Sequence, residues 1–281
     1  MQVTATSPPY DPRIPAGVLR LDYVSGLDGA SDWALVWPGE ITGLWIVVIH
    51  GHGSSGDQIF TRKDIRELWL PQFRACGAGL LSVNLRGNAW MGPAAAHDLH
   101  DLVNYMRVER GLKRTLFCSG SMGGTSNLIY GVLHPEDVDG IVARGAATDL
   151  TTYQPWCAQH ERPILREIAA AIADAYGGTP VERPDVYLRH SVVANARRLS
   201  MPVALSHGGD DQVIPVSQSR ALVAELSDLA TFRYDEIPGG NHDSPLHETA
   251  GFLWVLEQMS IENGGGDDRC DRSPDGTASH I

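Results

Sequence analysis

Residues 114–126 place one serine between an apolar run and a helical segment. The apolar run at residues 116–118 is typical of a short buried strand, and residues 122–133 read as a helix. Ser121 stands between the two, inside the sequence Ser-Gly-Ser-Met-Gly at residues 119–123. A serine on so sharp a turn has strained backbone and needs small residues two positions away on either side, because larger side chains would clash. The stretch therefore predicts a strand, a tight turn and a helix, with Ser121 at the apex.

This turn departs in one place from the pattern G-x-S-x-G that marks a nucleophilic serine between a strand and a helix. Ser119 stands where the first glycine is usual. Serine is also small, so the departure is mild, but a loop rich in glycine and serine can also be an ordinary turn. The rest of the chain decides between the two interpretations.

Composition narrows the possible partners. The chain has 281 residues, a length that suits one large α/β domain or two small ones. Its net charge of −12 argues against a nucleic acid or an anionic membrane as partner, because phosphate groups bind to basic surfaces. The four cysteines are scattered without C-x-x-C spacing, which excludes a disulfide framework and a zinc-finger pattern. No secretory signal and no apolar run of about 18 residues is visible, so the sequence predicts a cytoplasmic protein.

Apolar runs of strand length alternate with helical segments along most of the chain. The predicted strands cover residues 18–24, 32–37, 44–49, 78–85, 116–118, 139–143, 202–206 and 230–237. The predicted helices cover residues 58–74, 93–110, 122–133, 164–176, 217–229 and 245–259. The first two strands flank a turn of glycine and aspartate and predict an antiparallel hairpin. The alternation after them predicts a mainly parallel sheet with helices on both faces.

The same pattern divides the chain. Residues 1–17, with four prolines, are expected to be an extended lead-in, and residues 18–262 to form one α/β domain. Residues 150–199 interrupt the alternation and are too short for a core of their own, so they are interpreted as a cap-like insertion. Residues 263–281 have the composition of a disordered tail.

Three further loops follow predicted strands and carry residues suited to catalysis. His-Gly-His-Gly at residues 50–53 follows one strand, residues 207–215 with Asp211 follow another, and residues 238–245 with His242 follow the last. Open α/β sheets bind ligands at the carboxyl ends of their strands. We therefore expect these loops to meet near the serine turn.

The order serine, aspartate, histidine resembles that of the α/β-hydrolase superfamily. The resemblance covers about residues 18–259 and is strongest to the dienelactone-hydrolase and prolyl-oligopeptidase-like serine esterases. Residues 207–215 match the form H-G-x-x-D-x-x-[VI]-P of the family's acid loop, with Asp211 as the acid. The glycine-rich approach to His242 matches the histidine loop, and residues 50–53 match the H-G-x-G oxyanion loop. The resemblance implies an α/β-hydrolase fold, with a mostly parallel central sheet, helices on both faces and a small cap.

The residue types fit a nucleophilic mechanism. A serine hydroxyl is a poor nucleophile until a base takes its proton, which would be the role of His242 acting on Ser121. Asp211 would hold the imidazole in the required tautomer. The backbone N–H groups of Met122 and His52 are the expected oxyanion-hole donors, with Gly53 as the alternative to His52.

The resulting hypothesis is a serine esterase that forms an acyl-enzyme intermediate. It needs no metal or organic cofactor, and its expected partner is a small-molecule ester. A small peptidase or amidase of the prolyl-oligopeptidase type and a non-catalytic binding protein on the same fold are the alternatives. Asp210 and Asp149 remain open as alternative acids.

The substrate pocket has the weakest sequence signal. Trp90, Tyr153 and Trp156 are the candidates to line it, although ordinary packing would use the same aromatic residues. Arg86 and Arg144 are expected to pair with loop acids rather than with substrate.

Two groups of histidines raise the question of a metal. His50 and His52 have no obvious third ligand beside them, so they are not predicted to bind one. His97, Asp98, His100 and Asp101 on the helix at 93–110 point in different directions, so this group is interpreted as a solvated helix face.

Overall fold

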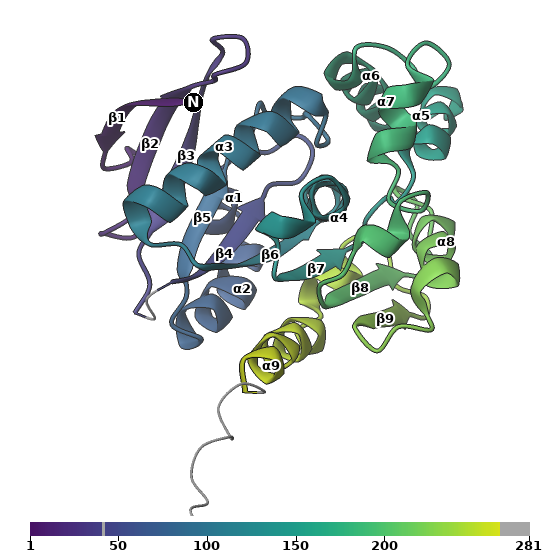
Figure 1. Ribbon diagram of the computed structural model, residues 1–281. Helices are drawn as coiled ribbons and strands as arrows, with labels where there is room; N and C mark the ends of the chain where they lie inside the picture. The colour runs from purple at the N-terminus through teal and green to yellow at the C-terminus, as the bar shows by residue number, and fades with distance from the viewer. Residues whose placement is uncertain (41–42, 265–281) are drawn as a thin grey trace, which may run out of the picture.

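The computed structural model describes residues 1–40 and 43–264, and these contain one sheet of nine strands (Figure 1). Its strand order is β1-β2-β3-β5-β4-β6-β7-β8-β9. The strands are β1 Gln2–Ser7, β2 Leu19–Val24, β3 Ser31–Trp37, β4 Leu44–Ile49, β5 Gly79–Val83, β6 Arg114–Gly120, β7 Gly140–Arg144, β8 Val203–Gly208 and β9 Phe232–Ile237. Strands β4 to β9 run parallel, and β1, β2 and β3 extend the sheet in antiparallel pairing. The predicted hairpin and the mostly parallel sheet are confirmed.

Helices cover both faces of the sheet. They are α1 Gln58–Thr61, α2 Lys63–Ala75, α3 Pro93–Arg110, α4 Met122–Leu133, α5 Leu150–Gln159, α6 Pro163–Tyr176, α7 Pro184–His190, α8 Ser217–Leu226 and α9 Ala250–Gly264. Apolar residues of α3, α4 and α8 belong to the core on one face, and those of α2 and α9 to the core on the other. Strand β4 is buried along its whole length, as its unbroken apolar run requires.

Some elements differ from the expectation. The predicted helix at residues 58–74 is interrupted at Arg62, whose backbone is extended at φ −83° and ψ 114°. The last predicted helix is a short 3₁₀ turn, Ser244–His247, followed by α9. Within the expected lead-in, β1 pairs with β2 at the edge of the sheet. Its mostly exposed, largely polar residues give no strand signal. The predicted tail lies outside the described residues apart from 263 and 264, which end α9.

Residues 150–199 form three helices, α5, α6 and α7, which lie together near one end of the sheet (Figure 1). Each begins with or contains a proline, and α6 ends at Gly177, whose φ of 73° suits glycine. Their apolar residues join the core that covers α3 and α4. No helix among the described residues is long and apolar enough to cross a bilayer.

Candidate active site

Ser121 occupies the strained turn that the sequence predicts. It lies between β6 and α4 with φ 57° and ψ −127°, a backbone conformation that residues other than glycine rarely adopt. The turn leaves no room for a side chain at Gly123, where a Cβ atom would lie 2.0 Å from the Ile49 carbonyl oxygen. The glycine is therefore needed for the close approach of α4 to β4.

Ser119, which replaces the usual first glycine, makes contacts of its own. Its side chain is fully buried, and its hydroxyl accepts a hydrogen bond from the Ile49 N–H at 2.9 Å. It also lies 3.3 Å from the side-chain amide group of Asn127 on α4. The hydroxyl thus joins β4, β6 and α4 directly beneath the serine turn.

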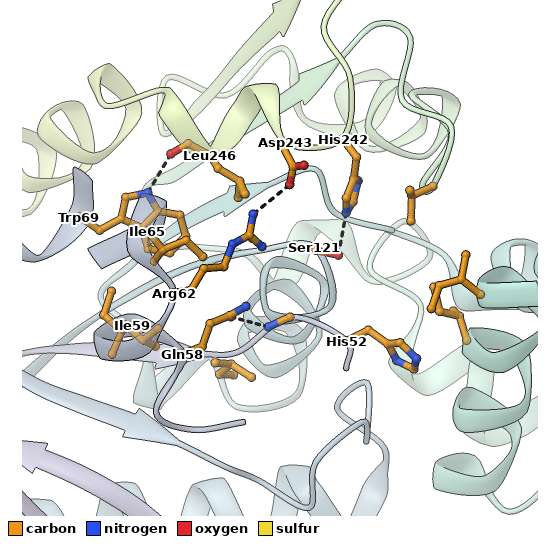
Figure 2. A pocket seen from close by; sticks show the side chains of 17 residues that line it. His52, Gln58, Ile59, Arg62, Ile65, Trp69, Ser121, His242, Asp243 and Leu246 are labelled. Atoms are coloured by element: carbon orange, nitrogen blue, oxygen red, sulfur yellow. Dashed lines mark hydrogen bonds and ion pairs between the residues drawn. The ribbon is translucent and has the colours of Figure 1, made fainter. Parts of the chain in front are cut away.

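The structure brings Ser121, Asp211 and His242 together. His242 Nε2 lies 2.9 Å from Ser121 Oγ, and His242 Nδ1 lies 2.7 Å from Asp211 Oδ2. Figure 2 shows the histidine ring directed at the serine from the loop after β9. These distances are within hydrogen-bonding range, so the three groups form one continuous relay.

The carboxylate of Asp211 is held ionised by its surroundings. Oδ1 accepts from the N–H groups of Val213 at 2.7 Å and Ile214 at 3.0 Å, and Oδ2 lies 3.3 Å from His207 Nε2. Burial by itself raises the pKa of Asp211, but the hydrogen bonds from His207 and His242 outweigh it and hold the pKa well below the usual aspartate value. The buried carboxylate therefore stays charged at neutral pH and favours a proton on His242 Nδ1.

Neither alternative acid contacts His242. The side chain of Asp210 is exposed, and only its backbone is tied into the loop, through a hydrogen bond to the Gly240 carbonyl. Asp149 caps α5 by accepting from the Thr151 N–H at 3.1 Å. The geometry selects Asp211.

The His-Gly-His-Gly loop after β4 is fixed by the loop at residues 84–91. The Gly53 N–H donates to Asn88 Oδ1 at 2.8 Å, so this group is already occupied. The Trp90 indole N–H donates to His52 Nδ1 at 3.2 Å. The backbone N–H groups of His52 and Met122 make no hydrogen bond to any other described residue. They remain available as a pair of donors on either side of Ser121.

A cavity of about 230 Å³ adjoins Ser121 and His242. Much of its wall is apolar, formed by Val48, Ile49, Ile59, Ile65, Trp69, Ile164, Ile168, Val213 and Leu246. Besides Ser121 and His242, four polar side chains stand among them, those of His52, Gln58, Arg62 and Asp243 (Figure 2). Six of the wall residues come from α1, α2 and α6, namely Gln58, Ile59, Ile65, Trp69, Ile164 and Ile168. No sequence motif marks these six.

The architecture was compared with that of known proteins. No protein-family model matches the chain, and no curated protein matches its sequence. Solved structures do match. One is a fluorophosphonate-binding serine hydrolase of Staphylococcus aureus, with a TM-score of 0.62 and 14% identity over 86% of this chain and 98% of that one. Another is a cold-adapted esterase from an Arctic intertidal metagenomic library, with a TM-score of 0.58 and 15% identity over 88% of this chain and 96% of that one. The chain has the α/β-hydrolase fold.

The same fold forms part of a longer relative. A puromycin-hydrolysing peptidase of Mycobacterium tuberculosis matches with a TM-score of 0.59 and 19% identity over 86% of this chain. This chain spans 38% of that peptidase. The α/β-hydrolase fold is therefore common to esterases and peptidases among the structures that match.

The aromatic residues expected to line the substrate pocket lie away from the cavity beside Ser121, so the prediction that they line it is wrong. Trp90 and Tyr153 are buried, with ring centroids 5.7 Å apart. The Tyr153 hydroxyl donates to the Val213 carbonyl at 3.0 Å, and Trp156 stacks on Tyr153 at 5.9 Å. None of the three lines the cavity beside Ser121. Each ring is packed against its neighbours, and the polar groups of Trp90 and Tyr153 serve to fix loops.

The arginines at the strand ends also differ from one another. Arg86 pairs with Asp28 at 2.7 Å and Asp98 at 2.6 Å, as expected. Arg144 forms no ion pair with an acid among residues 1–40 and 43–264, contrary to the expectation. It is buried, donates to the Glu248 carbonyl at 3.2 Å and lies over the Trp69 ring at 4.6 Å.

The acidic and histidine side chains of α3 take part in hydrogen-bond networks, so a fully solvated helix face is the wrong interpretation. Asp98 is buried and accepts from Ser25 Oγ at 2.5 Å. His100 Nδ1 lies 2.7 Å from Asp137, in a cluster with His134 and Glu136 whose possible ligand atoms all lie within 4.8 Å. The two imidazoles are stacked with an interplanar angle of 19°, so their nitrogen lone pairs do not converge on one point. Arg107 and Tyr130 donate to Asp137, which fits a structural network better than a metal site.

The two histidines of the oxyanion loop also have local partners. His50 Nδ1 lies 2.8 Å from the Gly51 carbonyl and Nε2 2.9 Å from the Asn84 carbonyl, so its ring is held between two backbone segments.

Proposed function

We propose that the protein is a serine hydrolase that cleaves carboxylic esters through an acyl-enzyme intermediate. The observation that carries the proposal is the relay Ser121–His242–Asp211 at the mouth of an apolar cavity. The substrate would be a small-molecule ester. A cytoplasmic location remains a prediction from the sequence.

In the first half of the reaction Ser121 Oγ attacks the ester carbonyl carbon while His242 Nε2 takes the hydroxyl proton. The proton on Nδ1 stays hydrogen-bonded to Asp211, which stabilises the imidazolium that forms. The negative charge moves to the carbonyl oxygen, where the N–H groups of Met122 and His52 would donate to it. His242 then gives its proton to the departing alkoxide, and the alcohol leaves.

In the second half a water molecule attacks the acyl-enzyme. His242 takes a proton from this water, and the tetrahedral intermediate again places its charge at the two N–H groups. The bond to Ser121 breaks, the serine recovers the proton from His242, and the carboxylic acid is released.

A peptidase or amidase is the second candidate, because the same groups can act on an amide. The observation that favours it is the likeness to the puromycin-hydrolysing peptidase. Cleavage of an amide requires protonation of the amine, which is a poorer leaving group than an alcohol. Of Ser121, His242 and Asp211, only His242 can supply that proton.

The test is hydrolysis of 4-nitrophenyl esters from acetate to dodecanoate by the wild-type protein and by Ser121→Ala, with a fluorophosphonate probe of the serine. We expect turnover and labelling by the wild type and neither by Ser121→Ala. Ser260→Ala, at an exposed serine of α9, is the control and should behave as wild type.

Labelling of Ser121 without turnover of any ester would favour the peptidase or amidase. Absence of labelling would overturn the hydrolase proposal and favour a binding protein on the same fold.

A further inference from the structure

A charged guanidinium stands in the wall of the cavity beside Ser121. Arg62 lies at the break between α1 and α2, and its extended backbone turns the side chain toward the cavity. Figure 2 shows its head group between Asp243 and the amide of Gln58, on the side of the cavity facing the serine. The Arg62 side chain is 38% exposed, so any donor without a protein partner is open to water or to a ligand in the cavity.

One edge of this guanidinium is firmly occupied. Nε lies 2.9 Å from Asp64 Oδ1 and Nη2 lies 2.8 Å from Asp64 Oδ2, a two-point contact. Such paired hydrogen bonds fix the plane of an arginine side chain. Asp64 therefore orients the guanidinium and is not itself among the residues that line the cavity.

The contact with Asp243 is weaker. It is a single hydrogen bond of 3.2 Å from Nη2 to Oδ1, and the Asp243 side chain is 58% exposed. A single, exposed ion pair of this kind contributes little and exchanges readily with another carboxylate. Asp243 can turn toward solvent without leaving a buried charge behind.

Two donor groups in the same wall have no acceptor. Arg62 Nη1 makes no hydrogen bond within the described part of the chain. Gln58 uses its oxygen to accept from the Gly51 N–H at 2.9 Å, and its amide nitrogen has no acceptor among the described residues. Both side chains line the cavity. The wall therefore offers hydrogen-bond donors and one positive charge to whatever fills the space.

We propose that the substrate carries an ionised carboxylate in addition to its ester group and that Arg62 binds it. This inference rests on the proposed function and names the class of ester. The incoming carboxylate takes the place of Asp243 on Nη2 and adds Nη1, which gives two hydrogen bonds in place of one. The guanidinium keeps two carboxylate partners, so the exchange leaves its charge balance unchanged. Arg62 is then a residue that determines specificity, and Asp243 is the internal group that the substrate displaces.

The second carboxylate can belong to the acyl part or to the alcohol part of the ester, and two matched pairs of substrates separate these sources. Mono-4-nitrophenyl glutarate and 4-nitrophenyl pentanoate differ in a terminal carboxylate on the acyl part. 4-Acetoxybenzoate and 4-acetoxybenzamide differ in a carboxylate on the alcohol part. Each pair is measured as kcat/KM at pH 7.5 with three variants, Arg62→Gln, Asp243→Asn and Arg66→Gln.

We expect Arg62→Gln to lower kcat/KM for the charged member of one pair by about 10- to 100-fold, the range for loss of a charge-assisted hydrogen-bond pair. Its effect on the uncharged member should stay within about threefold. Asp243→Asn should raise kcat/KM for the charged member, since it removes the competing carboxylate. Arg66→Gln, on the next turn of α2 and outside the cavity, should change neither. Equal losses on charged and uncharged esters in Arg62→Gln would overturn the proposal.

A binding experiment keeps the inference separate from ester turnover. Glutarate is added during fluorophosphonate labelling of Ser121. Protection in the wild type that is lost in Arg62→Gln supports the carboxylate site even if no ester is hydrolysed. Normal labelling without any protection by glutarate overturns it while the activated serine stands.

Discussion

The hydroxyl of Ser119 supplies an acceptor that glycine, usual at this position, lacks. It receives the Ile49 N–H at 2.9 Å in a fully buried place. Removing it leaves that N–H without a partner, and an unsatisfied buried donor costs about 1–3 kcal/mol. The serine is thus explained by local hydrogen bonding rather than by chemistry on the substrate.

We expect Ser119→Ala to lower the free energy of unfolding by about 1–3 kcal/mol, measured by urea denaturation. Ser119→Gly should lose the same hydrogen bond and add a smaller penalty from the greater freedom of the unfolded chain. Both variants should still be labelled at Ser121. Wild-type stability in Ser119→Ala would show that the hydroxyl is dispensable.

At the residue scale, the sequence identifies the proposed reacting groups better than it identifies the residues around them. Ser121, Asp211 and His242 stand out because each sits in a glycine-rich loop after an apolar strand. Trp90 and Tyr153 have the composition of pocket residues but lie in the core, because an aromatic side chain satisfies either environment.

Among the elements, the loop at residues 84–91 has the most unusual backbone. Leu85, Arg86, Trp90 and Met91 all have positive φ, between 45° and 62°. Such strain in residues other than glycine persists only where the surroundings fix it. Here the loop holds the oxyanion loop from two points, through Asn88 to Gly53 and through Trp90 to His52. Asn88 and Trp90 are positioning residues for the proposed oxyanion donor.

We expect Trp90→Phe to lower kcat by about 10-fold with little change in KM. Complete loss of an oxyanion donor lowers kcat by about 10²–10³-fold, and this substitution only makes the position of one donor less fixed. Trp254→Phe on α9, remote from the loop, is the matched control. A rise in KM at unchanged kcat would instead assign Trp90 to substrate binding.

Helix boundaries show where sequence information ends. The ranges predicted for α3 and α4 agree with the structure, since Pro93 begins one and Gly111, with φ 65°, ends it. The break at Arg62 is not visible in the sequence. Arg62 forms a hydrogen bond with Asp243, which is distant in the sequence. The neighbouring helix α1 contacts the loop at residues 50–53 through the hydrogen bond from the Gly51 N–H to Gln58. The cavity wall built by that break is missed for the same reason.

For the whole molecule, parallel pairing explains why the relay can be predicted from separate motifs. Strands β6, β8 and β9 all point the same way, so the loops that follow them emerge at one edge of the sheet. Any acid or histidine placed after those strands approaches Ser121. Strand β1 pairs antiparallel at the edge of the sheet, so its position does not follow from the alternation of strands and helices, and no sequence motif marks it.

Global stability should depend on pH through His190 of α7. This side chain is 4% exposed, its Nδ1 lies 2.8 Å from the Val186 carbonyl, and its Nε2 is buried without a partner among the described residues. Burial lowers the pKa of His190 to about 4. The unfolded chain, with a histidine pKa of about 6.5, takes up a proton between these values that the folded protein does not. Stability therefore falls as the pH falls through this window.

We expect His190→Leu to be less sensitive to acid than the wild type, by up to about 3 kcal/mol between pH 7.5 and pH 4. Urea denaturation of both proteins at pH 7.5, 6, 5 and 4 measures the difference. Parallel curves of unfolding free energy against pH would show that His190 gains its proton without penalty.

The strand order has a consequence for how the chain becomes active as it is made. Ser121 directly follows β6 in the interior of the sheet, whereas Asp211 and His242 follow β8 and β9, which are made later and lie at one end of the described sheet. A ribosome would expose the serine turn long before the groups that activate it. The nascent chain should remain inert until β9 has paired with β8. Labelling of Ser121 by a fluorophosphonate would then report completed folding as well as catalytic competence.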